Sequence, residues 1–252
     1  MNLHQLFYAQ DYSVAFRFRP SGDDGFGEGW NFIPATTFSW YADPFVIEHE
    51  GKVWLFVERM DRWRRLGSIA VCQILDNGKI TRFRDVIVEP FHLSYPNVFE
   101  YNGDMWMIPE SGGNRDIRLY VATDFPYNWK FVKSLYQGAN FVDTSFVTRI
   151  VDDKAILNSY DWDTRRSVFL RFDLQKMECN QLPDSPGVMD ERCGGNSFEK
   201  NGETFRVLQD CSTSYGSKII IRRIDNLDFE RGMAKDSPQA EFLPSDFDIK
   251  TG

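Results

Sequence analysis

A sequence motif that recurs about every fifty residues constrains the fold of this chain more than any other feature. The segment YADPFVIEHEGKVWLFVE (41–58) aligns with SYPNVFEYNGDMWMIPE (94–110), which brings proline onto proline, glycine onto glycine and glutamate onto glutamate. Two weaker copies follow. The position before the first strand of each copy, here called the anchor, recurs at intervals of 52, 48 and 52 residues: Asp43, Tyr95, Asp143 and Gly195. A period of this length indicates a repeat architecture.

Each copy has the pattern of an antiparallel meander. An apolar segment leads into a turn that contains Gly or Asp, and a second apolar segment follows. A third, alternating segment comes next, and a shorter, more polar one ends the unit: ITRFRDVIVE, NWKFVKSL and NLDFERGMA. Alternation bounded by such turns predicts strands, and no helical period is present. Four strands repeated at this spacing are typical of a propeller blade.

The repeat therefore predicts an all-β fold, a single-domain five-bladed β-propeller with four-stranded antiparallel blades. The fifth blade is expected from both chain ends, which would close the ring. Strands at LFYAQ and SVAFRFRP support this, whereas the C-terminal part is short, so we expect the chain to be a piece of a longer protein. The expected blades are 40–90, 91–139, 140–188, 189–238, and 1–39 together with 239–252.

Composition and charge limit the class of partner. The chain has 252 residues and a net charge of −8, so it lacks the concentrated basic surface that nucleic acids require. No stretch approaches the ~18 apolar residues that span a bilayer, and the start does not have the pattern of a signal peptide. The four cysteines show no disulfide or metal spacing, which predicts reduced thiols and a cytoplasmic location.

Candidate site residues follow from the geometry of a propeller. The first strand of each blade lines the central channel, so anchors and the ends of second strands are expected around one pocket. Carboxylates that share a cavity raise one another's pKa values, as acid and base chemistry on a glycosidic centre requires. We assign catalysis to Asp43, Glu110 and Asp143, and substrate binding to Glu58, Arg59, His92, Tyr95, Arg192, Asp210 and Tyr215.

Structural roles compete with these assignments. An Asp at the start of a strand is often an Asx-turn residue. Glu58 and Glu110 can pair with arginines such as Arg59 or Arg118, and a lone histidine such as His92 is often a buried, hydrogen-bonded one. The basic cluster in RMDRWRRLG is either a solvated hairpin tip or an anion contact near the mouth of the pocket.

The sequence carries no nucleotide-binding loop, no metalloprotease motif and no nucleophile elbow. We therefore expect no cofactor and assign no metal ligand. Because clustered carboxylates supply the oxygen ligands that divalent ions prefer, a divalent cation stays open as an alternative.

The chain resembles a known family at five segments: WYADPFVIEHEGKVWLFVE, EPFHLSYPNVFEYNGDMWMIPES, IRLYVATDFPYNWKF, FVDTSFV and VLQDCSTSYG. This family is the domain N-terminal to the glycosyltransferase part of glucosamine inositolphosphorylceramide transferases, with bacterial relatives that occur with surface-polysaccharide genes. The resemblance covers nearly the whole chain from about residue 35. The domain is similar in turn to the five-bladed propellers of glycoside hydrolase family 43 and its furanosidase relatives.

The resemblance implies roles for individual residues. Asp43, in its ADP context, matches the general base of the hydrolases. The carboxylate expected in the second blade is replaced by Tyr95, and Asp143 is the candidate for its part. Glu110 is the first candidate for the general acid and Glu58 the second. The lost carboxylate argues against ordinary hydrolysis, whereas transfer from a phosphate-activated donor needs only a base.

Three functions are consistent with these residues. The first is a glycosyltransferase of surface-polysaccharide or glycolipid biosynthesis, in which Asp43 deprotonates an acceptor hydroxyl and Arg192 or Arg59 binds the donor phosphate. Kinship with furanosidases implies furanosyl or phosphofuranosyl transfer. The alternatives are a glycoside hydrolase of the family 43 kind and a non-catalytic sugar-binding domain. Expected partners are a sugar donor, a glycan acceptor and a fused or associated biosynthetic domain.

Overall fold

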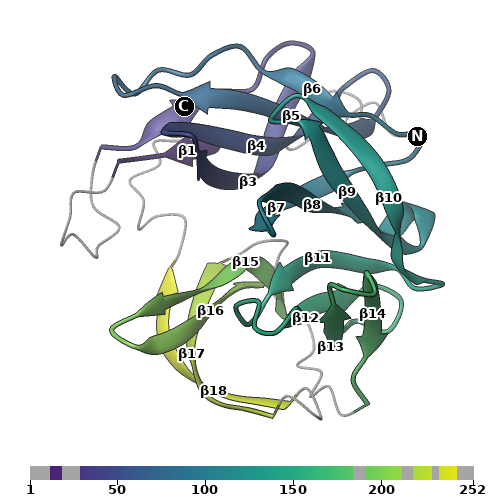
Figure 1. Cartoon of the computed structure of the whole chain (residues 1–252). Coiled ribbons are helices and arrows are strands. Elements are labelled where there is room, and N and C mark those ends of the chain that lie inside the picture. Colours follow the sequence, from purple (N-terminus) through teal and green to yellow (C-terminus); the bar gives the residue numbers. More distant parts are fainter. Residues whose placement is uncertain (1–11, 19–28, 184–190, 212–217, 229–232, 243–252) are drawn as a thin grey trace, which may run out of the picture.

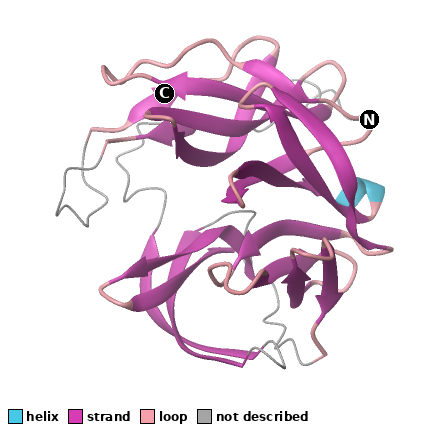
Figure 2. Ribbon diagram, in the orientation of Figure 1, coloured by secondary structure: helices cyan, strands magenta, loops and turns pink. Residues whose placement is uncertain are grey.

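The computed structural model describes residues 12–18, 29–183, 191–211, 218–228 and 233–242. Within them the chain is almost entirely β-strand, and the strands form four antiparallel four-stranded sheets (Figures 1 and 2). Each sheet is one blade, built from consecutive strands in the order inner to outer. The prediction of an all-β propeller with four-stranded antiparallel blades is confirmed.

The blades succeed one another in chain order around the molecule. The first contains β3 (Ser39–His49), β4 (Lys52–Asp61), β5 (Leu66–Ile74) and β6 (Arg84–Ile87), and the second contains β7 (Ser94–Tyr101), β8 (Asp104–Ser111), β9 (Asp116–Asp124) and β10 (Asn128–Gln137). The third contains β11 (Phe141–Phe146), β12 (Lys154–Asp161), β13 (Arg166–Asp173) and β14 (Glu178–Gln181), and the fourth contains β15 (Glu191–Lys200), β16 (Glu203–Asp210), β17 (Lys218–Asp228) and β18 (Met233–Phe242).

A tight turn joins the two inner strands of every blade. In the second blade it consists of Asn102 and Gly103, both with positive φ, 53° and 80°. A two-residue loop with both residues in this region is the turn whose twist matches that of the flanking strands. The other blades have Glu-Gly, Asp-Asp and Asn-Gly at the same place, again with positive φ. The turns expected from the repeat are therefore confirmed in all four blades.

Apolar side chains fill the space between neighbouring blades. Phe56 and Ile69 of blade one pack with Met107 and Tyr120 of blade two. Further clusters join blade two to blade three and blade three to blade four. Because each blade buries one face against the next, the inner strands are held at fixed positions about the centre.

The five-bladed, closed ring is not shown: the described residues contain four blades. The N-terminal part contributes a two-stranded sheet, β1 (Val14–Phe16) with β2 (Asn31–Ile33), which packs against blade one. The predicted strand LFYAQ and residues 243–252 lie outside the described residues. Residues 239–242, expected in the fifth blade, are the end of β18 in blade four.

The outer strand of blade four differs from the prediction as well. NLDFERGMA was expected to form it, but β17 continues through Asp228 and β18 begins at Met233. Periodicity alone cannot show where one long strand ends and the next begins. Among the described residues the one helix is a single 3₁₀ turn at Gly112–Asn114, and none is long and apolar enough to cross a bilayer.

Candidate functional site

A cavity of about 520 Å³ lies where the inner strands begin. Blades one, two and four contribute its walls, together with the segment that leads into β1. Three carboxylates and one arginine line it, and aromatic side chains stand beside them. The lining residues are Tyr12, Ser13, Val14, Ala15, Trp40, Ala42, Asp43, Pro44, Glu58, Met60, His92, Ser94, Glu110, Arg192 and Gln209.

The anchors of the repeat are β-bulges with left-handed backbone. Asp43, Tyr95 and Asp143 have φ of 49°, 46° and 54°, and the strand register is interrupted at each. A bulge re-aims a side chain and bends the strand. Positive φ is uncommon outside glycine, although Asp adopts it more often than most other residues. Backbone strain of this kind is concentrated at functional sites. The repeat thus marks the residues whose backbone departs from a regular strand.

Asp43 is half-buried at the wall of the cavity. Its Oδ2 accepts a hydrogen bond from the backbone N–H of Tyr95, at 3.2 Å, which joins blade one to blade two. Burial, and next the negative charge of Asp143, raise the pKa of Asp43 to about 7. A carboxyl group with this pKa exchanges its proton near neutral pH, as a general base must.

Glu58 is buried at the cavity wall beside His92. His92 Nδ1 accepts the backbone N–H of Gly67 at 3.0 Å, so the neutral imidazole carries its proton on Nε2, which lies 3.4 Å from Glu58 Oε1. Burial also lowers the pKa of His92. Burial and the charges of Asp43 and Glu110 raise the pKa of Glu58 to about 9, so it is protonated at neutral pH.

A second set of contacts joins blades two, three and four. Glu110 Oε2 accepts the backbone N–H of Asp143, at 3.3 Å. The Oδ2 of Asp143 in turn accepts hydrogen bonds from Arg192 Nε, at 2.6 Å, and from Gln209 Nε2, at 3.2 Å. Burial raises the pKa of Glu110 well above its usual range, and the charge of Asp143 adds to it. Arg192 holds Asp143 in place, because both side chains are almost fully buried.

Below this set, polar side chains close the centre between the inner strands. Asn97 of β7 and Asn196 of β15 exchange two amide hydrogen bonds, at 2.9 and 2.8 Å. The Tyr95 hydroxyl lies 2.6 Å from the Oγ of Ser145 in blade three. Because these buried groups satisfy one another, they set the separation of three blades at the floor of the site.

Gly67 lets Glu58 and His92 approach each other. A Cβ at this position would lie 2.5 Å from the carbonyl oxygen of Leu93, 2.7 Å from His92 and 2.9 Å from Glu58. We expect Gly67→Ala to lower the free energy of unfolding by about 1–3 kcal/mol, because the overpacked backbone has to shift. Urea denaturation measures this. Gly113→Ala is the matched control, since a Cβ there meets nothing within 4 Å. Equal stability of the two variants would contradict the packing described.

The raised pKa values make stability depend on pH in an unusual direction. Asp43 and Glu58 keep protons in the folded state, up to about pH 7 and 9, that the unfolded chain releases near pH 4. Unfolding therefore releases protons, and stability falls as pH rises through this window. We expect the urea midpoint to decrease from pH 5 to pH 9 and to decrease less in Glu58→Gln. Glu48→Gln, at an exposed position, serves as the control. A flat profile in the wild type would be the contrary result.

The structure brings together most of the residues assigned from the sequence. Asp43, Glu58, His92, Glu110 and Arg192 line the cavity, and Asp143 lies behind Arg192. Tyr95 is buried at the floor rather than in the wall. Two others are not in the lining: Arg59 pairs with Asp85 at 2.6 Å, and Asp210 pairs with Lys218 at 3.5 Å. Tyr215 lies outside the described residues.

Asp210 is displaced by a difference in register. In blades one and two the glutamate pairs with the residue before the anchor, as Glu110 does with Ser94. In blade four Asp210 instead pairs with Glu191, and its neighbour Gln209 pairs with Arg192 and lines the cavity. Equal spacing in sequence therefore did not mean equal position in space, because the bulge of blade four differs.

Several lining residues were missed by sequence reasoning. Ser94 and Trp40 were recognisable in principle, since Ser94 precedes an anchor and Trp40 precedes Asp43 by three residues. Nothing in the sequence indicated Tyr12, whose ring centroid lies 5.1 Å from that of Trp40. Within the described residues, no group of three or more His, Cys, Asp or Glu side chains is arranged to hold a metal ion.

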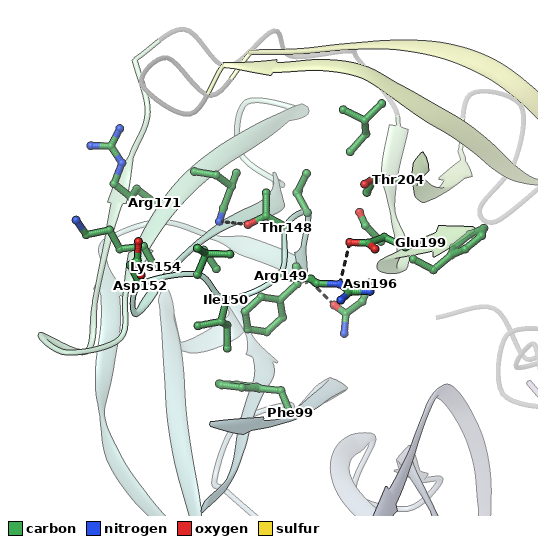
Figure 3. Close-up of a pocket in the computed structure, with 18 of the residues that line it drawn as sticks. Phe99, Thr148, Arg149, Ile150, Asp152, Lys154, Arg171, Asn196, Glu199 and Thr204 are labelled. Carbon is green, nitrogen blue, oxygen red and sulfur yellow. Dashed lines mark hydrogen bonds and ion pairs between the residues drawn. The ribbon is translucent and has the colours of Figure 1, made fainter. Parts of the chain in front are cut away.

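A larger cavity, of about 1150 Å³, lies at the other end of the inner strands (Figure 3). Phe99, Ile150 and Asn196 are among its lining residues, and Arg149 forms an ion pair with Glu199 at 2.8 Å. Three carboxyl groups whose pKa values burial raises line the smaller cavity: Asp43, Glu58 and Glu110. We therefore place the candidate active site in the smaller cavity, where strained backbone and perturbed carboxyl groups coincide.

Comparison with known proteins identifies related sequences. A family model described as glucosamine inositolphosphorylceramide transferase 1, N-terminal, matches residues 33–233. The glucosamine inositolphosphorylceramide transferase 1 of Oryza sativa subsp. japonica is 30% identical over 207 residues, which cover 74% of this chain and 26% of that protein. The Arabidopsis thaliana protein of that name is 28% identical over 199 residues, 75% and 26% of the two chains. This chain thus spans about a quarter of the length of these curated relatives.

Solved structures share the fold at low sequence identity. The α-L-arabinofuranosidase catalytic domain of Coprinopsis cinerea gives a TM-score of 0.59 at 14% identity and covers 79% of this chain and 68% of its own. A family 117 glycoside hydrolase of Zobellia galactanivorans gives 0.60 at 11%, covering 92% and 75%. The exo-β-1,3-galactanase of Phanerochaete chrysosporium gives 0.62 at 10%, covering 85% and 57%. Identities this low show a common fold alone.

Proposed function

Because this chain belongs to the family of the glucosamine inositolphosphorylceramide transferase 1 N-terminal domain, we propose that its smaller cavity binds a sugar and catalyses glycosyl transfer. The observation that carries the proposal is Asp43, a cavity-lining carboxyl group whose pKa is raised to about 7. The names of the curated relatives, which are transferases, support transfer over hydrolysis.

In the proposed reaction Asp43 is the general base. Its carboxylate takes the proton of an acceptor hydroxyl while that oxygen bonds to the anomeric carbon of the donor. The bond from this carbon to the donor phosphate breaks, and the phosphate leaves with the electron pair. Arg192 lines the cavity and is the candidate contact for that phosphate. Asp143 orients Arg192 and is, in this proposal, a positioning residue.

Glycoside hydrolysis is the second candidate, because one observation favours it. Glu58 lines the same cavity as Asp43, and burial together with the charge of Asp43 raises its pKa to about 9, so it is protonated at neutral pH. A carboxylate base and a carboxylic acid in one cavity are what hydrolysis of a glycosidic bond requires. Glu110, whose pKa is also raised, is the alternative acid.

One experiment separates these functions. The 252-residue chain is incubated with a panel of nucleotide- and polyprenyl-phosphate-activated sugars, including furanoses, and with hydroxyl acceptors, and the products are detected by mass spectrometry. Aryl arabinofuranosides and galactosides are tested in parallel. Glycosylated acceptor supports transfer, and release of free sugar from the aryl glycosides supports hydrolysis instead. Sugar binding with no product from either set would leave a non-catalytic sugar-binding domain.

The proposal extends to the fifth blade of the propeller. We propose that the N- and C-terminal segments complete a fifth blade beside β1 and β2, whose leading residues already form a wall of the cavity. Hydrogen exchange tests this, since amides 6–10 should then be as protected as those of β1.

We also propose a cytoplasmic enzyme that acts without a protein-bound metal, with a sugar donor, a glycan acceptor and an associated biosynthetic domain as partners. Full activity in EDTA would support the absence of a metal.

A further inference from the structure

The turn between β4 and β5 places an almost fully exposed tryptophan at the rim of the cavity. Trp63 is 83% exposed, and Phe38, on the neighbouring turn, is 63% exposed. The two turns are joined, because the backbone N–H of Arg62 donates to the carbonyl of Phe38 at 3.0 Å and its Nε donates to that of Thr36 at 3.2 Å. Two large aromatic side chains are thus exposed on turns that are joined to each other. Single exposed apolar residues need no explanation, but a group of them does.

Side-chain hydrogen bonds fix the turn that exposes Trp63. The Oδ1 of Asp61 accepts the backbone N–H groups of Trp63 and Arg64, each at 2.9 Å. The equivalent turn of blade three also carries a tryptophan, Trp162, but its ring packs 5.3 Å from the guanidinium of Arg192 and it is 42% exposed. The position in the blade therefore does not by itself force an indole into solvent.

Positive charge surrounds the exposed rings. Arg62, Arg64 and Arg65 follow one another on either side of Trp63, in a chain whose net charge is −8. Within the turn the one acidic side chain is Asp61, which is occupied with backbone N–H groups. Aromatic rings beside arginines are the composition of surfaces that enter the headgroup region of a bilayer. We call Phe38, Arg62, Trp63, Arg64 and Arg65 the rim patch.

The rim patch is continuous with the cavity. Phe38 immediately precedes β3, in which alternation places Trp40 and Ala42 on one face. Both line the cavity, as does Met60, the partner of Trp40 in β4. The path from the patch therefore leads past Trp40 directly to Asp43 and Glu58.

We infer that the rim patch docks the protein on an anionic lipid surface, with the mouth of the cavity facing the headgroups. The indole of Trp63 and the ring of Phe38 enter the interface, and Arg64 and Arg65, both exposed, contact lipid phosphates. This inference does not depend on the reaction proposed above, because binding to vesicles requires no substrate. Docking in this way holds the smaller cavity at the membrane surface, within reach of the sugar or phosphate of a lipid headgroup.

Sedimentation of the full chain with vesicles tests the inference. We expect binding to phosphatidylcholine vesicles that contain 30–40% phosphatidylserine, weaker binding at high salt, and little to phosphatidylcholine alone. Arg64→Glu should lower the partition coefficient at least fivefold, about the contribution of one basic residue near an anionic surface. Trp63→Ala should cause a loss of similar size. Both positions are exposed, so the variants should keep the melting temperature of the wild type.

The controls lie at the opposite end of the blades. Lys79→Glu makes the same change of charge on blade one, and Val151→Ala removes an exposed apolar side chain from blade three. Neither should alter vesicle binding. The inference is overturned if anionic vesicles are not bound, or if the rim variants bind as well as the controls. It is also overturned if inorganic phosphate at millimolar concentration removes binding completely, which would assign the arginines to a soluble anion.

Discussion

Asp43→Asn is expected to lower turnover about 10²- to 10⁴-fold, the usual contribution of a general base, while sugar affinity changes little. The amide cannot take a proton from an acceptor hydroxyl. It keeps the size of the carboxyl group, and its oxygen can still accept the N–H of Tyr95, so the contact between blades one and two remains. The variant therefore removes the proposed chemistry without removing the structure around it.

Initial rates on the substrate identified by mass spectrometry, together with calorimetric titration of the sugar, check this expectation. Asp85→Asn is the matched control, because Asp85 pairs with Arg59 and neither side chain lines the cavity. Turnover that survives Asp43→Asn unchanged would exclude Asp43 as the base. Sugar binding would then be the function that the cavity retains.

Arg192→Met is expected to have the largest effect on stability, a loss of about 3–5 kcal/mol in the free energy of unfolding. Arg192 and Asp143 are 7% and 3% exposed, and their contact of 2.6 Å joins blade three to blade four. Removal of the arginine leaves the buried carboxylate of Asp143 without its cation, close enough to Asp43 for its charge to raise the pKa of that group. Gln209 supplies a remaining hydrogen bond but no positive charge.

Urea denaturation measures this loss, and the double variant Asp143→Asn with Arg192→Met separates charge from packing. Neutralising the carboxylate should restore a large part of the stability, because the unpaired charge is then gone. Arg115→Met is the matched control: Arg115 and Asp163 also join neighbouring blades, at 2.8 Å, but their side chains are 53% and 46% exposed. Its midpoint should stay at the wild-type value. An equal loss in both arginine variants would contradict the role assigned to burial.

Both predictions concern the carboxyl groups at the centre of the propeller: the first their chemistry, the second the contacts that hold them in place. Two of the three carboxyl groups in the cavity have a hydrogen bond to the next blade, Asp43 to Tyr95 and Glu110 to Asp143. These contacts differ from the structural roles weighed against catalysis, because Arg59 pairs with Asp85 and Arg118 pairs with Glu89 and Asp116. Asp43 and Glu110 also carry raised pKa values. A hydrogen bond to one oxygen fixes the carboxyl group, while its position at the cavity wall leaves it in reach of a ligand.

Much of the fold was determined by the sequence alone. The fifty-residue period, the alternating strands and turns such as Asn102–Gly103 depend on local preferences, which act wherever the residues occur. The spacing of the repeat also singled out the anchors Asp43, Tyr95 and Asp143, although they were expected before the first strands and instead form bulges inside them. Convergence of Asp43, Glu58 and Glu110 followed from the repeat, since equivalent positions in successive blades face one centre.

Tertiary structure decided the rest, because it depends on register and on contacts between distant segments. Arg192 pairs with Asp143 across 49 residues, whereas Arg59, equally basic, faces away from the cavity. Asp210 shares its spacing with Glu58 and Glu110, yet a different bulge pairs it with Glu191 and brings Gln209 to the wall instead. Side chains alternate between faces along a strand, so a shift of one residue exchanges a cavity position for an outward one, and no spacing in the sequence reveals that shift.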